Sequence, residues 1–316
     1  MYEQIARNKR RALLYLVVFF LLWAGVGAAV GALAAAMTGP RGDQGNGADY
    51  LGDVVTGVVI AALAALLAIA VALRSGAGLV LSVSGARPAD PERYRQLHNL
   101  VEALAIGEGI PKPAVYVIDD PSPNAFATGT SPRRAVITVT TGLLALMNRA
   151  ELEGVLGHEM SHIRNYDVRL ILVVSTLIGL AGLLASLIWR SAFVVRGRNR
   201  DTAQIMMLVF VAGALLSVVA FVVGPLIRLA LSRRREYLAD VSGVELTRNP
   251  TAMISALRKL QQNETPFARF NHATAAMCID DPLQHHESRI HRLFDTHPPL
   301  ADRIRVLEEI ASGRSV

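Results

Sequence analysis

The hydrophobic residues of this chain are gathered into long, uncharged blocks. A helix needs about 20 apolar residues to cross a bilayer. The blocks that come close to or exceed this length cover residues 12–37, 54–73, 170–188 and 205–227. The pattern predicts four membrane helices arranged as two hairpins. A buried helical hairpin is the alternative for the last two blocks, although their Gly, Ser and Thr residues also suit contacts between membrane helices.

Basic residues next to the blocks predict the orientation of the chain, because loops rich in Lys and Arg stay in the cytoplasm. Residues 7–11 hold four basic side chains, so the N-terminus, residues 74–169 and residues 228–316 are expected inside. The loop 190–200 disagrees, since it holds four arginines and this topology puts it outside. Either that loop is an exception or the second hairpin does not fully cross. A cleaved signal peptide is disfavoured for the first block, because its apolar stretch exceeds the usual ~7–15 residues.

The residues between the second and third blocks read as a soluble region of mixed structure. Residues 91–109 show apolar positions at helical spacing, and two short runs rich in β-branched residues, Ala114–Ile118 and Ala135–Thr140, predict strands. We therefore expect an α+β fold that is mostly α, with a small sheet and a helical membrane part.

Composition narrows the class of protein. Hydrophobic residues make up 52% and charged residues 18% of the chain, which favours a membrane protein. The net charge of +6 comes from basic residues beside the apolar blocks, so we expect contact with a lipid bilayer and no nucleic-acid partner. The single cysteine, Cys278, excludes an intramolecular disulfide framework and a cysteine-based zinc site.

A metal-binding pattern lies on a helix predicted from Asn148 to Ile163, where Asn148 and Glu151 form a capping box. His158 and His162 are four residues apart, so both imidazoles lie on one helix face and reach one ion. Glu159 follows the first histidine and is placed to act as general base on a metal-bound water. The alternative is a pair of surface histidines on an ordinary helix.

A catalytic zinc needs a third protein ligand and one open position. Glu236 and Asp240 share one face of a helix predicted from Ser232 to Leu246. Glu236 is the candidate ligand, and Asp240 is the candidate acceptor for the outer nitrogen of a ligand histidine. A solvated carboxylate pair is the alternative. If His162 and Glu236 share one ion, the chain between them returns to the side of the membrane from which it started.

These residues resemble the HtpX-like membrane zinc metallopeptidases, which are relatives of the CAAX-prenyl endopeptidases of the Glu-ligand zincin type. The resemblance covers nearly the whole chain and departs at no metal or base position. It rests on the motifs His158 to His162, Glu236 to Asp240, Asn124 to Gly129, Ser232 to Tyr237, and Thr296 to Pro299 followed by Arg303.

The resemblance implies one Zn²⁺ per chain and a zincin-like domain with a small sheet beside the helix of His158. It implies that His297 helps to stabilise the oxyanion and that Asn124, Ala125 and Phe126 bind substrate. A capping or packing role is the alternative for His297, and a simple turn is the alternative for the second stretch. The other histidines of the C-terminal region read as solvated loop residues (His285, His286, His291).

The resemblance further implies an endopeptidase of the bacterial inner membrane that cleaves misfolded or damaged membrane proteins at the cytoplasmic face. A prenyl-protein processing peptidase and a zinc-binding scaffold without proteolysis are the alternatives. Protein or peptide substrates are expected as partners, with a homo-oligomer or quality-control partners left open. The expected domains are a first hairpin (1–83), the two parts of the catalytic domain (84–167 and 232–316) and a second hairpin (168–231).

Overall fold

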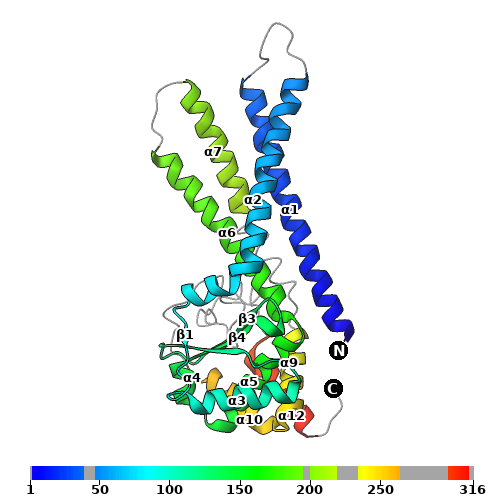
Figure 1. The fold of residues 1–316 in the computed structure, drawn as a ribbon, viewed down its shortest axis with the longest axis vertical. Coiled ribbons are helices and arrows are strands. Elements are labelled where there is room, and N and C mark those ends of the chain that lie inside the picture. The colour runs from blue at the N-terminus through cyan, green and yellow to red at the C-terminus, as the bar shows by residue number, and fades with distance from the viewer. Residues whose placement is uncertain (1, 39–46, 195–199, 219–233, 264–297, 313–316) are drawn as a thin grey trace. The chain divides into compact units, whose positions relative to one another are not determined.

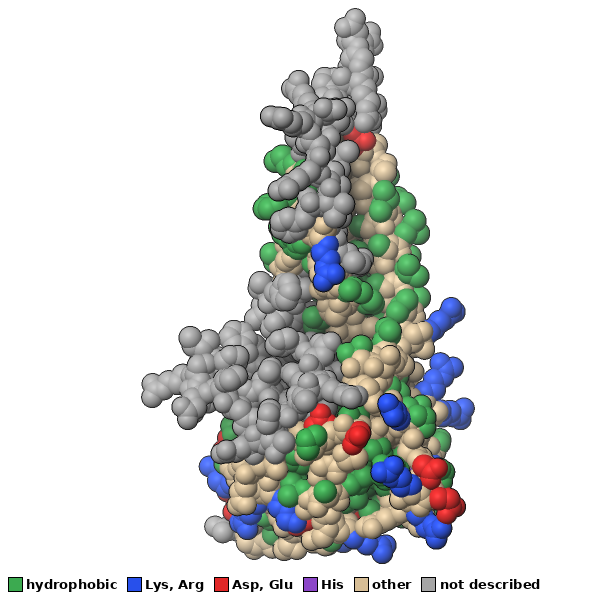
Figure 2. Space-filling model, turned by 90° about the vertical axis from the view of Figure 1, so that its left-hand side faces the viewer, with side chains coloured by type: hydrophobic (Ala, Val, Ile, Leu, Met, Phe, Trp, Pro, Cys, Tyr) green, Lys and Arg blue, Asp and Glu red, His purple; other side chains and the backbone are tan. Residues whose placement is uncertain are grey.

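The computed structural model describes residues 2–38, 47–194, 200–218, 234–263 and 298–312. The chain forms two compact units. Residues 1–10, 75–175 and 228–316 make up the sheet unit, and residues 11–74 and 176–227 make up the helical unit. Figure 2 shows charged side chains gathered on the sheet unit, whereas hydrophobic side chains dominate the visible face of the apolar helices.

Long apolar helices supply the helical unit (Figure 1): α1 (Tyr2–Thr38), α2 (Gly47–Val83), α6 (Asp167–Val194) and α7 (Arg200–Val218). Among the described residues, two helical stretches are long and apolar enough to cross a bilayer, Asn8–Ala36 and Tyr50–Val83. They confirm the first two predicted spans. Both helices extend beyond the predicted apolar blocks, and α2 continues through Arg74.

The second predicted hairpin is tested only in part. Helix α6 contains the third predicted block, and it follows α5 (Arg149–Arg164) after a bend of 79°. If the bent pair is counted as one span, the described residues contain three. Helix α7 contributes a shorter apolar stretch, Met206–Leu215, and residues 219–227 lie outside the described residues. Four crossings therefore stay a prediction.

Glycines allow the backbones of α1 and α2 to touch. A Cβ added at Gly27 would lie 2.3 Å from the carbonyl oxygen of Gly57, and one added at Gly31 would lie 2.5 Å from that of Asp53. Small residues of this kind let membrane helices approach closely. Trp189 joins α6 to α7, because its indole N–H donates to the Ser217 hydroxyl at 3.2 Å.

A four-stranded sheet in the order β1-β2-β4-β3 lies in the sheet unit (Figure 1). Strands β2 (Ala114–Ile118) and β4 (Ala135–Thr140) pair in parallel, as predicted at the same residues. The short β1 (Arg87–Pro88) was not predicted and pairs antiparallel with β2. Residues Ala125–Gly129, for which a turn was one reading, form β3, an edge strand antiparallel to β4.

The helices of the sheet unit gather mainly on one side of the sheet, as Figure 1 shows. They are α3 (Arg95–Glu108), α4 (Thr141–Leu146), α5, α9 (Arg234–Thr247), α10 (Pro250–Gln261) and α12 (Leu300–Ala311), with a short 3₁₀ turn at Pro132–Arg134. One hydrophobic core joins them to the strands. The prediction that α3 starts at residue 91 was wrong, because the Asp90 carboxylate accepts from the backbone N–H groups of Glu92 and Arg93 and holds a turn there.

Candidate metal centre

Helix α5 carries the two histidines and is fixed at its N-terminus. The predicted capping box is present, since the Asn148 side chain accepts from the backbone N–H of Glu151 and the Glu151 carboxylate accepts from that of Asn148. The Glu151 carboxylate also accepts from Lys259 at 2.6 Å and from Ser255 at 2.7 Å. Burial alone raises the pKa of Glu151, but these hydrogen bonds outweigh it and hold the pKa below its ordinary value.

Glycine also sets the distance between α5 and α9. A Cβ added at Gly243 would lie 2.8 Å from the backbone nitrogen of His158, and one added at Gly157 would lie 3.1 Å from the Thr247 methyl carbon. The two helices therefore pack almost backbone to backbone at the first histidine. This packing brings Glu236, on the first turn of α9, to the face of α5 that carries His158 and His162.

His158, His162 and Glu236 point their ligand atoms at one another, with all of these atoms within 4.8 Å. The Nε2 atoms of the histidines are 3.1 Å apart, and Glu236 oxygens lie 3.5 Å from Nε2 of His158 and 3.6 Å from Nε2 of His162. Tetrahedral zinc with bonds of about 2.0–2.1 Å places ligand atoms about 3.4 Å apart. The three buried donors therefore fit one zinc ion.

The outer nitrogens of the two histidines support the same fit. Nδ1 of His158 donates to Asp240 at 2.8 Å, and Nδ1 of His162 donates to Asp167 at 3.2 Å. Each carboxylate holds the proton on Nδ1 and leaves the Nε2 lone pair for a metal. Two lone pairs 3.1 Å apart repel each other unless a proton or a cation lies between them, and a metal ion meets this need.

Arg303 on α12 completes the surroundings of His158. Its side chain is fully buried, and its guanidinium donates to both carboxylate oxygens of Asp240, from Nη2 at 2.6 Å and from Nε at 2.8 Å. Burial raises the pKa of Asp240, but the Arg303 charge and hydrogen bonds outweigh it and lower that pKa. Burial lowers the pKa of His158, yet the hydrogen bonds that its ring donates to Asp240 and Glu236 outweigh this and raise it to about 9.

Asp167 is the corresponding partner of His162, and sequence reasoning missed it. It begins α6 and is almost fully buried. An acidic residue directly before an apolar block was the only sequence signal, and it reads equally well as an ordinary helix-start residue. Arg303 belongs to the motifs of the resemblance, but the sequence did not predict its contact with Asp240.

Glu159 lies between the metal donors and the edge strand. It is 2% exposed, and burial raises the pKa of its carboxyl group, although His158, His162 and a hydrogen bond from the backbone N–H of Ala127 act in the opposite direction. A carboxylate in this position can accept a proton, and its raised pKa makes it a stronger base than an exposed glutamate.

The predicted substrate residues lie on or beside β3. The side chain of Asn124 accepts from the backbone N–H of Ala125 at 2.8 Å and so shapes the start of the strand. Phe126 is 2% exposed and packs its ring with Val80, Ile118 and Leu172. His297, Cys278 and the histidines at 285, 286 and 291 lie outside the described residues.

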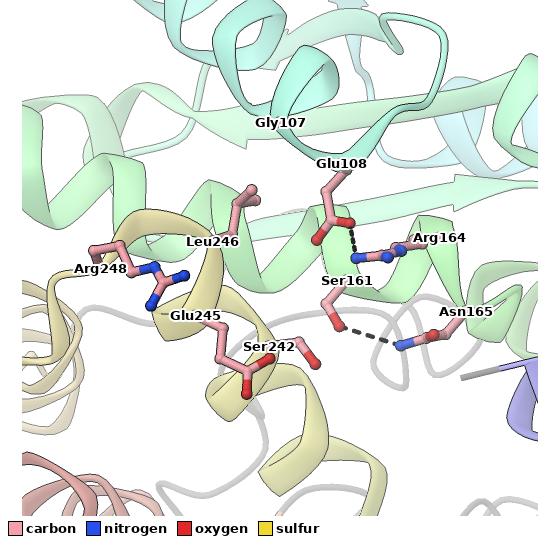
Figure 3. A pocket seen from close by; sticks show the side chains of 9 residues that line it. All are labelled: Gly107, Glu108, Ser161, Arg164, Asn165, Ser242, Glu245, Leu246 and Arg248. Atoms are coloured by element: carbon pink, nitrogen blue, oxygen red, sulfur yellow. Dashed lines mark hydrogen bonds and ion pairs between the residues drawn. The ribbon is translucent and has the colours of Figure 1, made fainter.

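A cavity of about 530 Å³ lies on a different part of the sheet unit (Figure 3). Its lining comes from α3, α5, α9 and the residues that follow α5 and α9, and it includes none of the three metal donors. Glu108 and Arg164 form an ion pair on its wall. Burial raises the pKa of Glu108 even beside this arginine. The cavity is therefore not the metal centre.

The chain matches a peptidase family and full-length bacterial relatives. The signature of peptidase family M48 matches residues 91–311. Two proteins named "Protease HtpX homolog" match 98% of this chain and 100% of their own length, one from Streptococcus thermophilus at 40% identity and one from Streptococcus mutans at 42%. The crystal structure of S. mikatae Ste24p matches with a TM-score of 0.44 and 18% identity, over 82% of this chain and 65% of that one.

The matched range contains both histidines, Glu159, Glu236 and Asp240. The match spans more than half of the chain, and the two relatives align with nearly all of it. With its apolar helices and its group of three metal donors, the chain therefore belongs to peptidase family M48 and is an HtpX-like membrane metalloprotease.

Proposed function

We propose that the chain is a zinc endopeptidase in which His158, His162 and Glu236 hold the ion and Glu159 is the general base. The observation that carries this proposal is the convergence of the three donors while buried carboxylates hold the outer nitrogens of both histidines. When bound, zinc supplies a Lewis acid for the scissile carbonyl and lowers the pKa of water at the site.

Glu159 then moves the protons of the reaction. Its carboxylate takes a proton from the water as the water oxygen bonds to the carbonyl carbon. It then delivers this proton to the amine nitrogen, which leaves as the C–N bond breaks. The hydrogen bond from the Ala127 N–H fixes the carboxylate against the edge strand. His297, which precedes the two prolines that lead into α12, is proposed as a donor to the developing oxyanion.

The edge of β3 that faces away from β4 is the proposed substrate-binding surface. The backbone oxygen of Asn124 accepts from the N–H of Thr140, so Asn124, Phe126 and Thr128 direct their backbone groups toward β4. Ala125 and Ala127 direct theirs away from it. A peptide added to this edge as a strand would run past Glu159, with the backbone oxygen of Ala125 as its acceptor and with Asn124 and Phe126 shaping the edge.

The proposed place of action is the cytoplasmic face of a bacterial inner membrane, and the proposed substrates are misfolded or damaged membrane proteins. The basic residues around Asn8 support this orientation. The metal helix α5 is followed directly by the apolar α6, which supports cleavage close to the bilayer surface. The predicted division into two hairpins and a two-part catalytic domain belongs to the same proposal.

The test is zinc-dependent cleavage by the detergent-purified protein, prepared with a chelator. Unfolded casein is the substrate, and Glu159→Gln is compared with Glu153→Gln, a partly exposed glutamate of the same helix. We expect activity to fall 10²- to 10⁴-fold in the first variant, with zinc still bound, and to persist in the second. Equal cleavage by wild type and Glu159→Gln would overturn the role of Glu159.

Substrate choice is tested separately. One protein is offered in its folded form and in a reduced, alkylated form, beside a prenylated peptide. Cleavage of the unfolded form alone supports quality control. Preference for the prenylated peptide would instead support the prenyl-processing alternative. Stoichiometric zinc without cleavage of any of the three would favour a scaffold.

A further inference from the structure

The first residues of α1 belong to the unit that contains the metal centre. Residues 1–10 are part of the sheet unit, although the rest of α1 belongs to the helical unit. Asn8 is 3% exposed in this segment. Its side-chain amide donates to the backbone oxygen of Asn165 at 2.9 Å and to the Asp167 carboxylate at 2.7 Å. Both N–H bonds of this amide therefore have an acceptor.

These two acceptors lie in the turn between α5 and α6. Asn165 is the C-cap of α5, and Tyr166 has a φ of 60°, a left-handed conformation that side chains other than glycine seldom adopt. The ammonium group of Lys9 lies 4.3 Å from the centre of the Tyr166 ring. Asn8 and Lys9 together hold a strained turn in place from the far end of the sequence.

Asp167 connects the Asn8 amide to His162, one of the three metal donors. One of its oxygens accepts from Asn8, and the other accepts from Nδ1 of His162 at 3.2 Å. Arg235, the neighbour of Glu236 in sequence, places its Nε 3.6 Å from the oxygen that Asn8 contacts. The direction of the Asp167 carboxylate therefore decides where His162 points its other nitrogen.

The two histidines have parallel supports. The carboxylate behind His158 is held by two hydrogen bonds from Arg303, and the carboxylate behind His162 is held by one from Asn8. The Asn8 amide is a neutral donor, whereas the Arg303 guanidinium is charged. We therefore expect removal of Asn8 to have a smaller effect than removal of Arg303.

We propose that Asn8 is a positioning residue of the metal centre, which orients His162 through Asp167 and makes the N-terminal segment part of the peptidase machinery. This inference rests on the proposed zinc site. It assigns to residues 1–10 a role beyond that of a basic flank for the first membrane helix.

The experiment measures zinc affinity of the full chain in detergent, by competition with a chromophoric chelator. Asn8→Ala and Asn8→Leu leave the charge unchanged, and Leu keeps the branched shape of the side chain, so a packing role would survive in the Leu variant. We expect both to weaken zinc binding about fivefold, against the 10- to 100-fold loss usual for a direct partner of a ligand such as Asp167 in Asp167→Ala. We also expect kcat to fall while KM changes little.

The matched control is Asn249→Ala, which removes an asparagine cap from α10. It lowers the unfolding midpoint of the protein and is expected to leave zinc affinity unchanged. The double variant Asn8→Ala with Asp167→Ala adds a second test. If Asn8 acts through Asp167, the double variant binds zinc no more weakly than Asp167→Ala alone.

The outcomes separate the two proposals. Wild-type protein without zinc binding, or with binding unaffected by His162→Ala, would overturn the metal centre and this inference with it. If the wild type and both Asn8 variants bind zinc equally tightly, only this inference is overturned. Additive losses in the double variant, or retention of affinity by Asn8→Leu alone, would do the same, because they would assign Asn8 a separate structural effect.

Discussion

A contact inside the helical unit and the metal centre inside the sheet unit depend on different kinds of interaction. The contact between α1 and α2 depends on missing side chains, since Gly27 and Gly57 bring two backbones together. The metal centre depends on directed hydrogen bonds between buried charged groups, as in the series His158, Asp240, Arg303. The first arrangement is sensitive to volume and the second to donors and acceptors. The α1–α2 contact should therefore respond to added volume, and the His158–Asp240–Arg303 series to the loss of a donor or a charge.

The largest effect is expected when a buried charged side chain of the sheet unit is replaced by an uncharged one of similar volume. Arg303→Met should lower the free energy of unfolding by about 3–5 kcal/mol, because it removes the charged partner of the buried Asp240. Unfolding in detergent measures this loss. Arg305→Met is the control, since the Arg305 side chain is 69% exposed on the same helix. Equal losses in the two variants would contradict a special role for the buried pair.

The next effect is a pH dependence of the metal-free protein. The pKa of His158 is raised to about 9 in the folded state from 6.5. Its contribution to stability is therefore complete below pH 6.5 and is lost as the pH rises through about 9, by up to about 3 kcal/mol. Unfolding in chelator at pH 6.5 and pH 9.5 measures it.

Two controls sharpen the pH experiment. His158→Gln should remove the slope between these pH values. Added zinc should also remove it, because the metal binds the neutral imidazole. A slope that is the same in His158→Gln would assign the titration to another group.

Adding volume where α1 meets α2 should damage the helical unit without reaching the metal centre. Gly27→Ala places a methyl group 2.3 Å from the Gly57 oxygen and should cost about 1–3 kcal/mol of unfolding free energy. Gly25→Ala is the control, because a Cβ there meets nothing within 4 Å. Zinc affinity should be unchanged in both variants. Loss of zinc affinity in Gly27→Ala would show that the two units are not independent in this respect.

The smallest effect concerns the capping box. Glu151→Gln should cost about 1–2 kcal/mol at pH 7, since it weakens charge-assisted bonds from Lys259 and Ser255. The pKa of Glu151 is lowered in the folded state, so its contribution is present above its ordinary pKa of 4.5 and is lost as the pH falls below that value. The two proteins should therefore converge in stability in acid. A constant difference down to pH 3 would contradict this origin.

The parts of the fold that follow from local pattern were predictable from the sequence. The capping box of Asn148 and Glu151 and strands β2 and β4 depend on neighbours within a few residues, and the structure confirms them. The approach of His158, His162 and Glu236 followed from helical spacing combined with the need for a third ligand. Strand β1 was missed because two residues, one of them proline, carry too little pattern.

The supports of the site were not predictable, because their partners are far away in sequence. Asn8 bonds Asp167 across 159 residues, and Arg303 bonds Asp240 across 63. Nothing near Asn8 distinguishes it from an ordinary polar residue at a helix start. Gly243 looked equally ordinary, although its lack of a side chain is what lets α9 reach α5. The role of His297 stays a prediction from the resemblance, and the role of Glu159 is tested by the cleavage assay with Glu159→Gln.

The separation between His158 and Arg303 also affects how the protease is made. The ring nitrogen of His158 meets an arginine that is synthesised 145 residues later. At about 10 residues per second, the ribosome takes on the order of 15 s to cover that distance. During this time the metal motif has left the ribosome without the guanidinium that fixes Asp240. A nascent chain therefore carries an unfinished catalytic centre until α12 has been made.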